Sequence, residues 1–495
     1  MAAEAHVLVF PCPAQGHINS MLPFAAALLD AGVFVTFLHT DHNFRRATSV
    51  AGSPRLRFLS IPDGLPDDHP RSLGDMLELE KSLREVGAVR YRALLASLSS
   101  AGHPSQDASD GCVDGFLPVT CVVADGLLTW AIDSAEELGV PALAFRTSSA
   151  SSFLAYQTVH RLVELGEIPF PAGGGGLDEP VRGVPGMESF LRRRDLPSVF
   201  RRRSGGTDGG VDPDLDPILH VFAEVTAHSR KARALVFNTT ASLEAPALAH
   251  IAPRMRDVFA VGPVHAVPSP SPAPAPASSL WTEDAGCVAW LDGQADRSVV
   301  YVSLGSLAVI TRDQFTEFLS GLVAAGYPFL WVLRQDMVGA SQDQDATTPQ
   351  EAIKAAAGNN KARVVTWAPQ RDVLRHRAVG CFLTHAGWNS TLEGVAEGVP
   401  MVCWPFFGDQ QINSRLVGAV WRNGLDMKDV CERGVVERMV REAMESDAIR
   451  SSAQGLARVV RRDVGDAGSS AREFQRLVRF IKELSVEDAK SNHQN

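Results

Sequence analysis

Several patterns that would define other classes of protein are missing from this sequence. No run of about 18 apolar residues occurs, so no membrane-spanning helix is predicted. The N-terminal stretch, Met1–Pro13, has no basic region and only a short apolar run, which predicts a first strand rather than a signal peptide. The net charge is −10, and no region interleaves basic with aromatic residues, which argues against a nucleic-acid partner.

Cysteine is scarce and scattered. The 495 residues include seven cysteines, an odd number, and no pair has the spacing of a zinc finger. Most of them lie within apolar runs, as buried free thiols do. This usage is typical of a reducing compartment, so we expect the protein in the cytosol.

Metal-binding patterns are weak as well. The segment Asp212–Asp216 contains the Asp-x-Asp spacing with which some enzymes hold a divalent cation, but it lies in a glycine-rich stretch and favours a solvated turn. The histidines show neither HExxH nor clustered spacing. We therefore expect no metal site. The arginine runs at 192–194 and 201–203 flank acidic segments, and we interpret them as solvated loop.

The length and the alternation of strands and helices indicate two domains. A chain of 495 residues is too long for one ordinary core. Strand-like and helix-like runs alternate up to Phe145 and start again at Val299, after a proline-rich stretch at 268–279. Glycine-rich residues 170–215 interrupt this rhythm. The expected parts are an N-terminal domain at 1–262, an interdomain linker at 263–285 and a C-terminal domain at 286–469.

The most specific pattern lies between Trp367 and Gln410. This stretch reads as a strand, a tight connection, a helix and a second strand, a βαβ unit whose ligand crevice lies at the carboxyl ends of its strands. Four residues surround the helix N-terminus, where free N–H groups and the helix dipole favour phosphate. These residues are His385, Gly387, Asn389 and Ser390.

Further polar and aromatic residues complete this pattern. Trp367 offers a flat face that can stack a base. Glu393 lies one turn beyond Asn389 on the same helix face and suits a diol. Asp409 and Gln410 end the loop after the second strand and suit more hydroxyl groups. Together these groups suggest a sugar nucleotide.

A candidate catalytic pair stands in the first half of the chain. His17 ends the first strand–helix loop and opens a helix, whose dipole disfavours the imidazolium form and so favours a neutral base. Asp125 ends a later strand, and both strand ends open onto the same edge of the sheet. A carboxylate there would fix the imidazole tautomer and stabilise the proton that the ring gains. The alternative is that His17 only caps its helix and Asp125 only ends its strand.

The stretch 367–410 resembles the signature box of the plant family 1 glycosyltransferases of secondary metabolism, which use UDP-sugars. The resemblance extends over nearly the whole chain. It implies an α/β structure of the GT-B type, with two Rossmann-like doubly wound domains that face each other across a cleft. It also implies that the last helix, at about 470–487, packs back on the first domain.

The resemblance also implies an activity. The chain is expected to be an inverting O-glucosyltransferase that takes glucose from UDP-glucose and gives a β-glucoside of a small lipophilic acceptor, such as a terpenoid or phenolic alcohol. It is expected to need neither a cofactor nor a metal, and to be a monomer. The acceptor itself cannot be predicted from the sequence.

The resemblance assigns roles to individual residues. His17 and Asp125 match the catalytic dyad. The residues expected to bind UDP are Ser306, Trp367, Ala368, Gln370, His385, Gly387, Asn389, Ser390 and Glu393. The residues expected to hold the sugar are Thr147, Trp388, Asp409 and Gln410. Arg146 stands where many relatives have an aromatic residue; contact with a phosphate or hydroxyl group and pairing with a nearby carboxylate are both open.

Three other function classes fit less well. The first is a nucleotide-sugar epimerase or hydrolase on the same fold, and a hydrolase of glycosides would need two facing carboxylates rather than one His–Asp pair. A dehydrogenase would need GxGxxG after the first strand, where PCPAQGH stands instead. A sugar-nucleotide binder without catalytic activity would be preferred only if the base were missing, and His17 is present.

Overall fold

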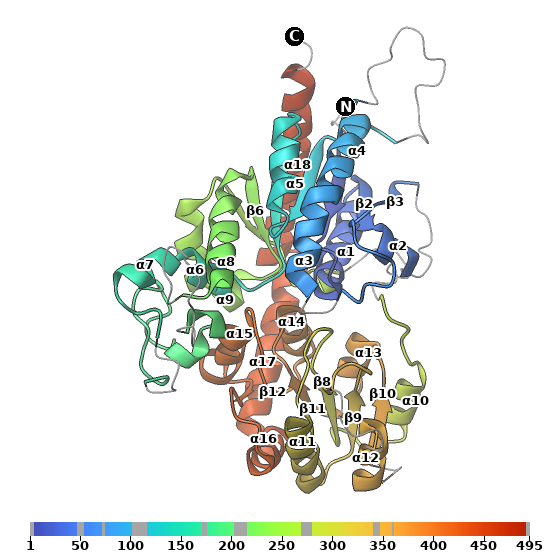
Figure 1. The fold of residues 1–495 in the computed structure, drawn as a ribbon, viewed down its shortest axis with the longest axis vertical. Coiled ribbons are helices and arrows are strands. Elements are labelled where there is room, and N and C mark those ends of the chain that lie inside the picture. Colours follow the sequence, from blue (N-terminus) through green and yellow to red (C-terminus); the bar gives the residue numbers. More distant parts are fainter. Residues whose placement is uncertain are drawn as a thin grey trace. The chain divides into compact units, whose positions relative to one another are not determined.

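Figure 1 shows the computed structural model of the chain, in which contacts divide the protein into two units, each with its own parallel β-sheet. The first unit comprises residues 1–157, 220–280 and 462–495, and the second comprises residues 158–219 and 281–461. The structure describes residues 4–46, 54–71, 75–100, 116–170, 176–201, 215–268, 280–339, 347–358 and 361–491.

The first unit is built on a seven-stranded sheet with the order β3-β2-β1-β4-β5-β6-β7, in which every pair of neighbours is parallel. Its strands are β1 (His6–Phe10), β2 (Phe34–Thr40), β3 (Leu56–Ile61), β4 (Cys121–Asp125), β5 (Ala142–Arg146), β6 (Ala234–Phe237) and β7 (Val258–Ala260). The chain runs outward from β1 in both directions, so β1 and β4 flank the point where the strand order reverses. Ligands of such sheets bind at the carboxyl ends of the strands at this point.

Helices connect these strands, as parallel pairing requires. The helices of this part of the chain are α1 (Gln15–Asp30), α2 (Asp41–Arg46), α3 (Met76–Ser82), a π-helical segment η2 (Leu83–Gly87), α4 (Ala88–Ser100), α5 (Thr129–Glu137), α6 (Ala150–Gln157), α8 (Pro217–His228), α9 (Ala241–Ile251) and α18 (Ser469–Ser491). Strand β1 is buried along its whole length, which explains its continuous apolar sequence.

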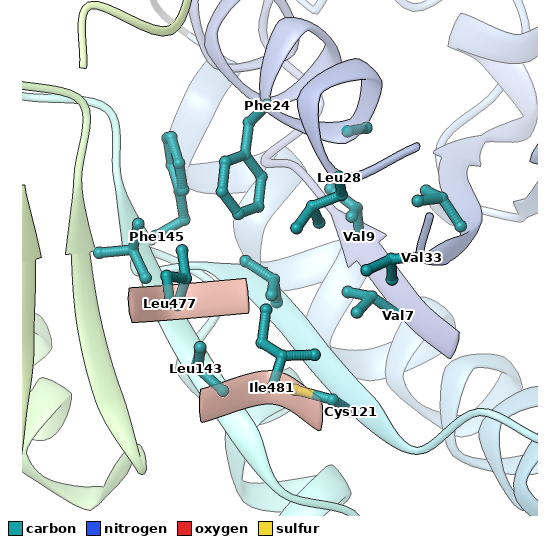
Figure 2. Packing of buried hydrophobic residues seen from close by; sticks show 14 of the residues in the cluster. Val7, Val9, Phe24, Leu28, Val33, Cys121, Leu143, Phe145, Leu477 and Ile481 are labelled. Carbon is teal, nitrogen blue, oxygen red and sulfur yellow. The ribbon is translucent and has the colours of Figure 1, made fainter. Parts of the chain in front are cut away.

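The C-terminal helix α18 is part of the core of the first unit. Figure 2 shows Leu477 and Ile481 from this helix packed beside Leu143, Phe145 and Cys121 of the sheet. All five side chains are fully buried. The last helix of the chain therefore packs on the sheet that the first residues build.

The second unit is built on a six-stranded parallel sheet with the order β10-β9-β8-β11-β12-β13. Its strands are β8 (Val299–Ser303), β9 (Phe329–Val332), β10 (Ala362–Val365), β11 (Val379–Thr384), β12 (Met401–Cys403) and β13 (Gly424–Asp426). The strand order reverses between β8 and β11, where Ser303 pairs with Thr384. Two parallel doubly wound sheets agree with the predicted fold class.

The helices of the second unit follow the same alternation. They are α7 (Val159–Glu164), α10 (Gly286–Asp292), α11 (Arg312–Ala325), α12 (Pro349–Ala357), α13 (Gln370–Arg375), α14 (Trp388–Glu397), α15 (Gln410–Arg415), a π-helical segment η8 (Leu416–Trp421), α16 (Arg433–Glu445) and α17 (Asp447–Val464). Helix α14 ends before Gly398, which adopts the left-handed conformation with φ of 70° that glycine favours after a helix.

The contact units and the domain bounds expected from sequence are not the same. Residues 158–219 belong to the second unit, although the expected N-terminal domain spans 1–262. Most of the expected linker, residues 269–279, and part of the Asp-x-Asp segment, residues 212–214, lie outside the described residues. The expected domain bounds stay a prediction.

Two further expectations can be checked in the described part of the chain. Six cysteines there form no disulfide, as the scattered spacing predicts; they are Cys12, Cys121, Cys287, Cys381, Cys403 and Cys431. Cys112 lies outside the described residues. Within the same ranges, no helix combines the length and the apolar character that a membrane crossing requires.

Candidate active site

His17 and Asp125 meet at the carboxyl edge of the first sheet. His17 lies in the first turn of α1, directly after the loop that leaves β1, and Asp125 is the last residue of the neighbouring strand β4. The His17 Nδ1 atom lies 2.5 Å from Asp125 Oδ2. Thr147, which follows the next strand β5, places its Oγ1 atom 3.0 Å from the same nitrogen. The ends of three adjacent strands thus converge on one imidazole ring.

The hydrogen bond to Asp125 determines the form of the histidine ring. An ionised carboxylate only accepts hydrogen bonds, so Nδ1 carries the proton and the neutral ring has its lone pair on Nε2. The side chain of His17 is 23% exposed, whereas that of Asp125 is only 2% exposed. A substrate can therefore reach the imidazole but not the carboxylate.

Asp125 stays ionised although it is buried. Burial acts to raise the pKa of this carboxyl group, but the charge and hydrogen bond of His17, the N–H of Leu127 and the charge of Arg146 together lower the pKa below its ordinary value. The Leu127 N–H donates to Asp125 Oδ1 at 3.0 Å. The arrangement is that of a base and the anion that orients it.

Arg146 is a buried cation beside this pair. Its Nη2 donates to Thr226 Oγ1 at 3.2 Å, and its guanidinium carbon lies 4.7 Å from the centroid of the Phe153 ring. Its side chain also fills the space over Gly126, where a Cβ atom would come within 2.5 Å of Arg146 Cδ. Burial lowers the pKa of Arg146 to about 10, and the charge of Asp125 opposes this shift. The interaction with the charge of Asp125 agrees with one of the two open roles, pairing with a nearby carboxylate.

The second group of expected site residues lies at the switch point of the second sheet. Strand β11, helix α14 and strand β12 form the predicted βαβ unit, with β11 and β12 parallel. The His385 ring is packed between the backbones of Gly305 and Gly387, where added Cβ atoms would lie only 2.5 and 2.4 Å from Nε2. Asn413 of α15 donates from Nδ2 to the Ala386 carbonyl at 2.9 Å and so holds the connection in place. Both glycines are required for this close approach.

His385 is a neutral ring. Burial lowers its pKa to about 4, and a hydrogen bond with the Ser303 backbone only partly opposes this shift. At neutral pH the imidazole can therefore donate a hydrogen bond without carrying a full charge. The N-terminus of α14 lies beside it, and the N-terminus of a helix suits an anion.

Gln370 joins three other polar residues of the second unit. Its Nε2 donates to Ser390 Oγ at 3.0 Å and to Glu393 Oε2 at 2.7 Å, and its Oε1 accepts from the Tyr301 hydroxyl at 3.2 Å. Burial raises the pKa of Glu393, although its hydrogen bond with Gln370 acts in the opposite direction. Four residues from three elements, β8, α13 and α14, are thus fixed as one polar cluster.

The expected base platform, Trp367, stacks on a residue that the sequence did not single out. The rings of Trp367 and Trp281 lie 5.6 Å apart between centroids, at 21° to each other. The Asp284 N–H also donates to the Trp367 carbonyl at 3.0 Å. Because Trp281 lies 86 positions away in sequence, no local pattern could have indicated this contact.

The residues expected to hold the sugar differ in their exposure. Asp409 is partly exposed at the N-terminus of α15. Gln410 is buried, and its Oε1 accepts the N–H groups of Phe406 and Phe407 at 2.8 and 3.1 Å. Trp388 is only 3% exposed. Whatever Trp388 contributes to a ligand therefore comes mainly from its backbone at the start of α14.

Comparisons with known proteins identify the family. The family described as UDP-glucoronosyl and UDP-glucosyl transferase matches residues 255–459. The myricetin 3-O-rhamnoside 1,2-glucosyltransferase of Crocosmia x crocosmiiflora is 41% identical over 98% of this chain and 97% of its own length. The 7-deoxyloganetic acid glucosyltransferase of Catharanthus roseus is 40% identical over 97% of this chain and 98% of its own. The chain belongs to the plant UDP-glycosyltransferase family.

Solved structures support the same assignment. Os79 from O. sativa in complex with UDP is similar to this UDP-glycosyltransferase with a TM-score of 0.77 and 29% identity, over 97% of this chain and 100% of Os79. A UDP-glucose: anthocyanidin 3-O-glucosyltransferase in complex with UDP has the same TM-score at 24% identity and supports the fold alone. The predictions of family, of the GT-B fold and of a glycosyltransferase enzyme are therefore confirmed.

One group of side chains in the described part of this UDP-glycosyltransferase has a spacing that could hold a metal ion. The ligand atoms of His69, Asp75 and Glu78 lie within 4.8 Å of one another. However, His69 Nδ1 accepts the Arg71 N–H at 3.1 Å, so the neutral ring carries its proton on Nε2, which lies 3.5 Å from Glu78 Oε2. A metal bound at Nε2 would shift that proton to Nδ1. The Nδ1 proton would then face the Arg71 N–H, which is also a donor. This geometry fits a metal poorly.

The interpretation of the first arginine run as solvated loop is wrong. Arg192 pairs with Asp195, which has no exposed surface, and Arg193 and Arg194 pair with Glu179 and Asp178. The sequence shows the acidic neighbours but not that the pairs are partly buried. In the second run, Arg201 lies 3.4 Å from a carboxylate of the second unit, and residues 202–203 lie outside the described ranges.

Proposed function

We propose that this enzyme transfers glucose from UDP-glucose to a hydroxyl group of a small lipophilic acceptor. The hydrogen bond between His17 and Asp125 carries the proposal, because it supplies an oriented base beside a buried anion. In one in-line displacement, His17 Nε2 takes the hydroxyl proton while the acceptor oxygen bonds to the anomeric carbon of glucose. The bond from that carbon to UDP breaks, and an α-linked donor gives a β-glucoside. Asp125 stabilises the imidazolium that forms.

The departing diphosphate is assigned to the N-terminus of α14. Its N–H groups and dipole, the neutral His385 ring and the side chains of Asn389 and Ser390 would stabilise growing negative charge. We assign uracil to Trp367 and Ala368, the ribose to Gln370 and Glu393, and the diphosphate also to Ser306 and Gly387. Thr147, Trp388, Asp409 and Gln410 are assigned to the sugar.

The acceptor class rests on chemistry and on relatives. Relatives named for myricetin 3-O-rhamnoside, 7-deoxyloganetic acid and (R)-mandelonitrile differ widely in acceptor. We therefore expect a terpenoid, phenolic or similar alcohol. Incubation with UDP-glucose and a panel of such alcohols, read by mass spectrometry, would identify it, and the proton coupling at the anomeric carbon of the product would show whether it is a β-glucoside.

The deciding experiment is His17→Ala. We expect UDP binding to persist in calorimetry while transfer falls by about 10²–10⁴-fold, the range of general-base catalysis. His228→Ala is the matched control. His228 Nε2 lies 2.9 Å from Asp133 Oδ2, so it forms a similar pair that includes neither residue of the dyad. A transfer rate of His17→Ala within about threefold of the wild-type rate would be a far smaller loss than general-base catalysis predicts, and it would refute the proposal.

We also propose that transfer needs neither a metal nor an organic cofactor, and that the enzyme is a cytosolic monomer. Full activity in EDTA would support the first part, whereas loss of activity that manganese restores would refute it. Light scattering of the purified chain would test the monomer, and a fluorescent fusion would test its location.

A further inference from the structure

Asp195 is the centre of a buried ion cluster in the second unit. It ends a one-turn 3₁₀ helix, η3 (Arg193–Asp195), and has no exposed surface. Its Oδ1 lies 3.0 Å from Arg192 Nη2 and 3.1 Å from Lys428 Nζ. Its Oδ2 lies 3.0 Å from Arg192 Nε and 3.3 Å from Arg415 Nε. One carboxylate thus joins cations from three separate parts of the chain.

Lys428 extends this cluster to helix α15. Its side chain is only 3% exposed. Its Nζ donates to the Gln411 carbonyl at 2.6 Å and lies 3.1 Å from Asp426 Oδ2. Asp426 in turn accepts a hydrogen bond from Ser414 of α15. We call the five charged residues Arg192, Asp195, Arg415, Asp426 and Lys428 the Asp195 cluster.

The Asp195 cluster anchors a surface segment on α15 at two points. Besides the contact with Asp195, Arg415 Nε donates to the Phe190 carbonyl at 2.8 Å. The segment is itself folded back, since the Val181 N–H donates to the Leu191 carbonyl at 3.0 Å. Residues 181–195 therefore form a compact piece that is held against one side of α15.

Helix α15 is the element that begins with Gln410. It has only six residues, too few for a stable helix of its own, so its position depends on tertiary contacts. The side chain of Asn413 in α15 donates to the Ala386 carbonyl. Lys428 donates to the carbonyl of Gln411, which also belongs to α15. The connection at Ala386 keeps its own anchor through Asn413, whereas the Gln411 carbonyl in the first turn of α15 is held by Lys428.

Ion pairing links the members of the cluster. Buried ions are stable only when they are paired, and removal of one partner leaves an uncompensated charge. Burial acts to raise the pKa of Asp195, but Arg192 and Lys428 lower it below its ordinary value, so the carboxylate stays ionised. Loss of either Asp195 or Lys428 therefore weakens the hold on the first turn of α15.

We propose that Asp195 and Lys428 are positioning residues for the sugar end of the donor site, which they act on through the first turn of α15. The inference rests on the proposed function, because Asp409 and Gln410 are assigned to glucose there. The cluster orders the residues assigned to glucose. Its loss should therefore weaken the contacts with glucose and leave the contacts with UDP unchanged.

Calorimetry with UDP and with UDP-glucose, without an acceptor, tests this separation. For Asp195→Asn and Lys428→Gln we expect UDP-glucose to bind about tenfold more weakly, since small displacements of positioning groups have effects of this size or larger. UDP should bind within about twofold of the wild type, because the Asn413 anchor remains. An equal loss for both ligands, or none for either, would overturn the inference.

One further variant controls for simple destabilisation. Asp178→Asn is the matched control, because Asp178 also pairs with Arg192 but its side chain is 65% exposed, and surface pairs contribute little. It should change neither affinity.

Hydrogen exchange separates this inference from the proposed function. Faster exchange of residues 181–195 and of α15 in Asp195→Asn, with no change in Asp178→Asn, would support the anchor whether or not the chain transfers glucose. Unchanged exchange would overturn it. A wild-type chain that binds neither UDP nor UDP-glucose would instead refute the proposed function.

Discussion

His17 and Asp125 lie 108 positions apart in the sequence, yet their side chains form a hydrogen bond of 2.5 Å. The sheet brings them together, because β1 and β4 are neighbours in register, with Phe10 opposite Ala124. Asp125, the last residue of β4, and His17, in the first turn of the helix after β1, therefore lie at the same edge of the sheet. The parallel order of the strands, rather than any local motif, creates this pair.

Replacement of Asp125 by asparagine tests the role of its charge. Asp125→Asn keeps the shape of the side chain but removes the anion that stabilises the imidazolium, so we expect the turnover rate to fall by about 10²–10⁴-fold. UDP affinity, measured by calorimetry, should not change. The control is Asp133→Asn, which alters the Asp–His pair on the surface. If the turnover rate fell by the same factor in Asp125→Asn and in Asp133→Asn, the result would count against the catalytic role of the dyad.

Glu393→Gln tests the assignment of the ribose. A carboxylate can accept hydrogen bonds from both hydroxyl groups of the diol, whereas an amide has a single acceptor oxygen. We expect UDP to bind about tenfold or more weakly, since hydrogen bonds to charged groups contribute about 1.5–3 kcal/mol. The preference of the wild type for UDP over 2′-deoxy-UDP should shrink in the variant.

A control for Glu393→Gln lies one turn along the same helix. Glu397 pairs with Arg375 at 3.1 Å and does not join the Gln370 cluster. Glu397→Gln should keep both the affinity for UDP and the preference over the 2′-deoxy analogue. Equal preference in Glu393→Gln and the wild type would refute the ribose contact.

The sequence predicts those parts of this protein that repeat a strand–helix unit. The buried apolar strands, the glycine stop at Gly398 and the polar residues after strand ends follow from local patterns and from the rule that parallel strands share an edge. No helix is predicted at α17, where Gly455 and two serines lower the helix propensity. Ala453, Ala457 and Val460 recur at helical spacing, and their packing in the core stabilises the helix.

Contacts between distant segments are beyond what the sequence can predict. Trp281 stacks on Trp367, and Asp195 pairs with Lys428, although both pairs are far apart along the chain. Neither pair belongs to one periodic element, so spacing carries no signal for it. The same holds for the burial of Trp388, whose place beside polar residues suggests exposure while its side chain is buried.

Gly387→Ala tests the packing of the His385 ring. A Cβ atom at residue 387 would lie 2.4 Å from His385 Nε2, so the ring must move although the backbone angles of Gly387 suit an alanine. We expect UDP to bind about tenfold more weakly in calorimetry, because the ring no longer faces the diphosphate. Displacement of the His385 ring, rather than strain in the backbone of residue 387, would cause this loss of UDP affinity.

The double variant separates these two causes. In a chain that already carries His385→Ala, Gly387→Ala meets no ring and should have little further effect on UDP affinity. The two substitutions should therefore be non-additive by about 1 kcal/mol or more, as for residues in direct contact. Additive losses would show that Gly387 acts on its own backbone instead.

His39 predicts how the stability of the first unit depends on pH. This residue of β2 is 4% exposed and lies among aromatic rings, with the Phe37 and Phe58 centroids at 4.9 and 6.0 Å. Burial lowers its pKa to about 4, from about 6.5 in an unfolded chain. Between these two values the unfolded chain binds a proton that the folded chain does not. The free energy of unfolding therefore falls as the pH falls from about 6.5 to 4, and this contribution is constant above about 6.5.

His39→Phe removes this titration and keeps a ring among the other rings. Relative to the wild type, the variant should gain about 2 kcal/mol more stability at pH 4.5 than at pH 8, because only the wild type then loses stability through His39. Denaturant unfolding of both proteins at the two pH values measures this difference. The comparison at pH 8, where the ring is neutral in both states, isolates the effect of packing. A stability difference between variant and wild type that is the same at both pH values would show that His39 is not the group that titrates.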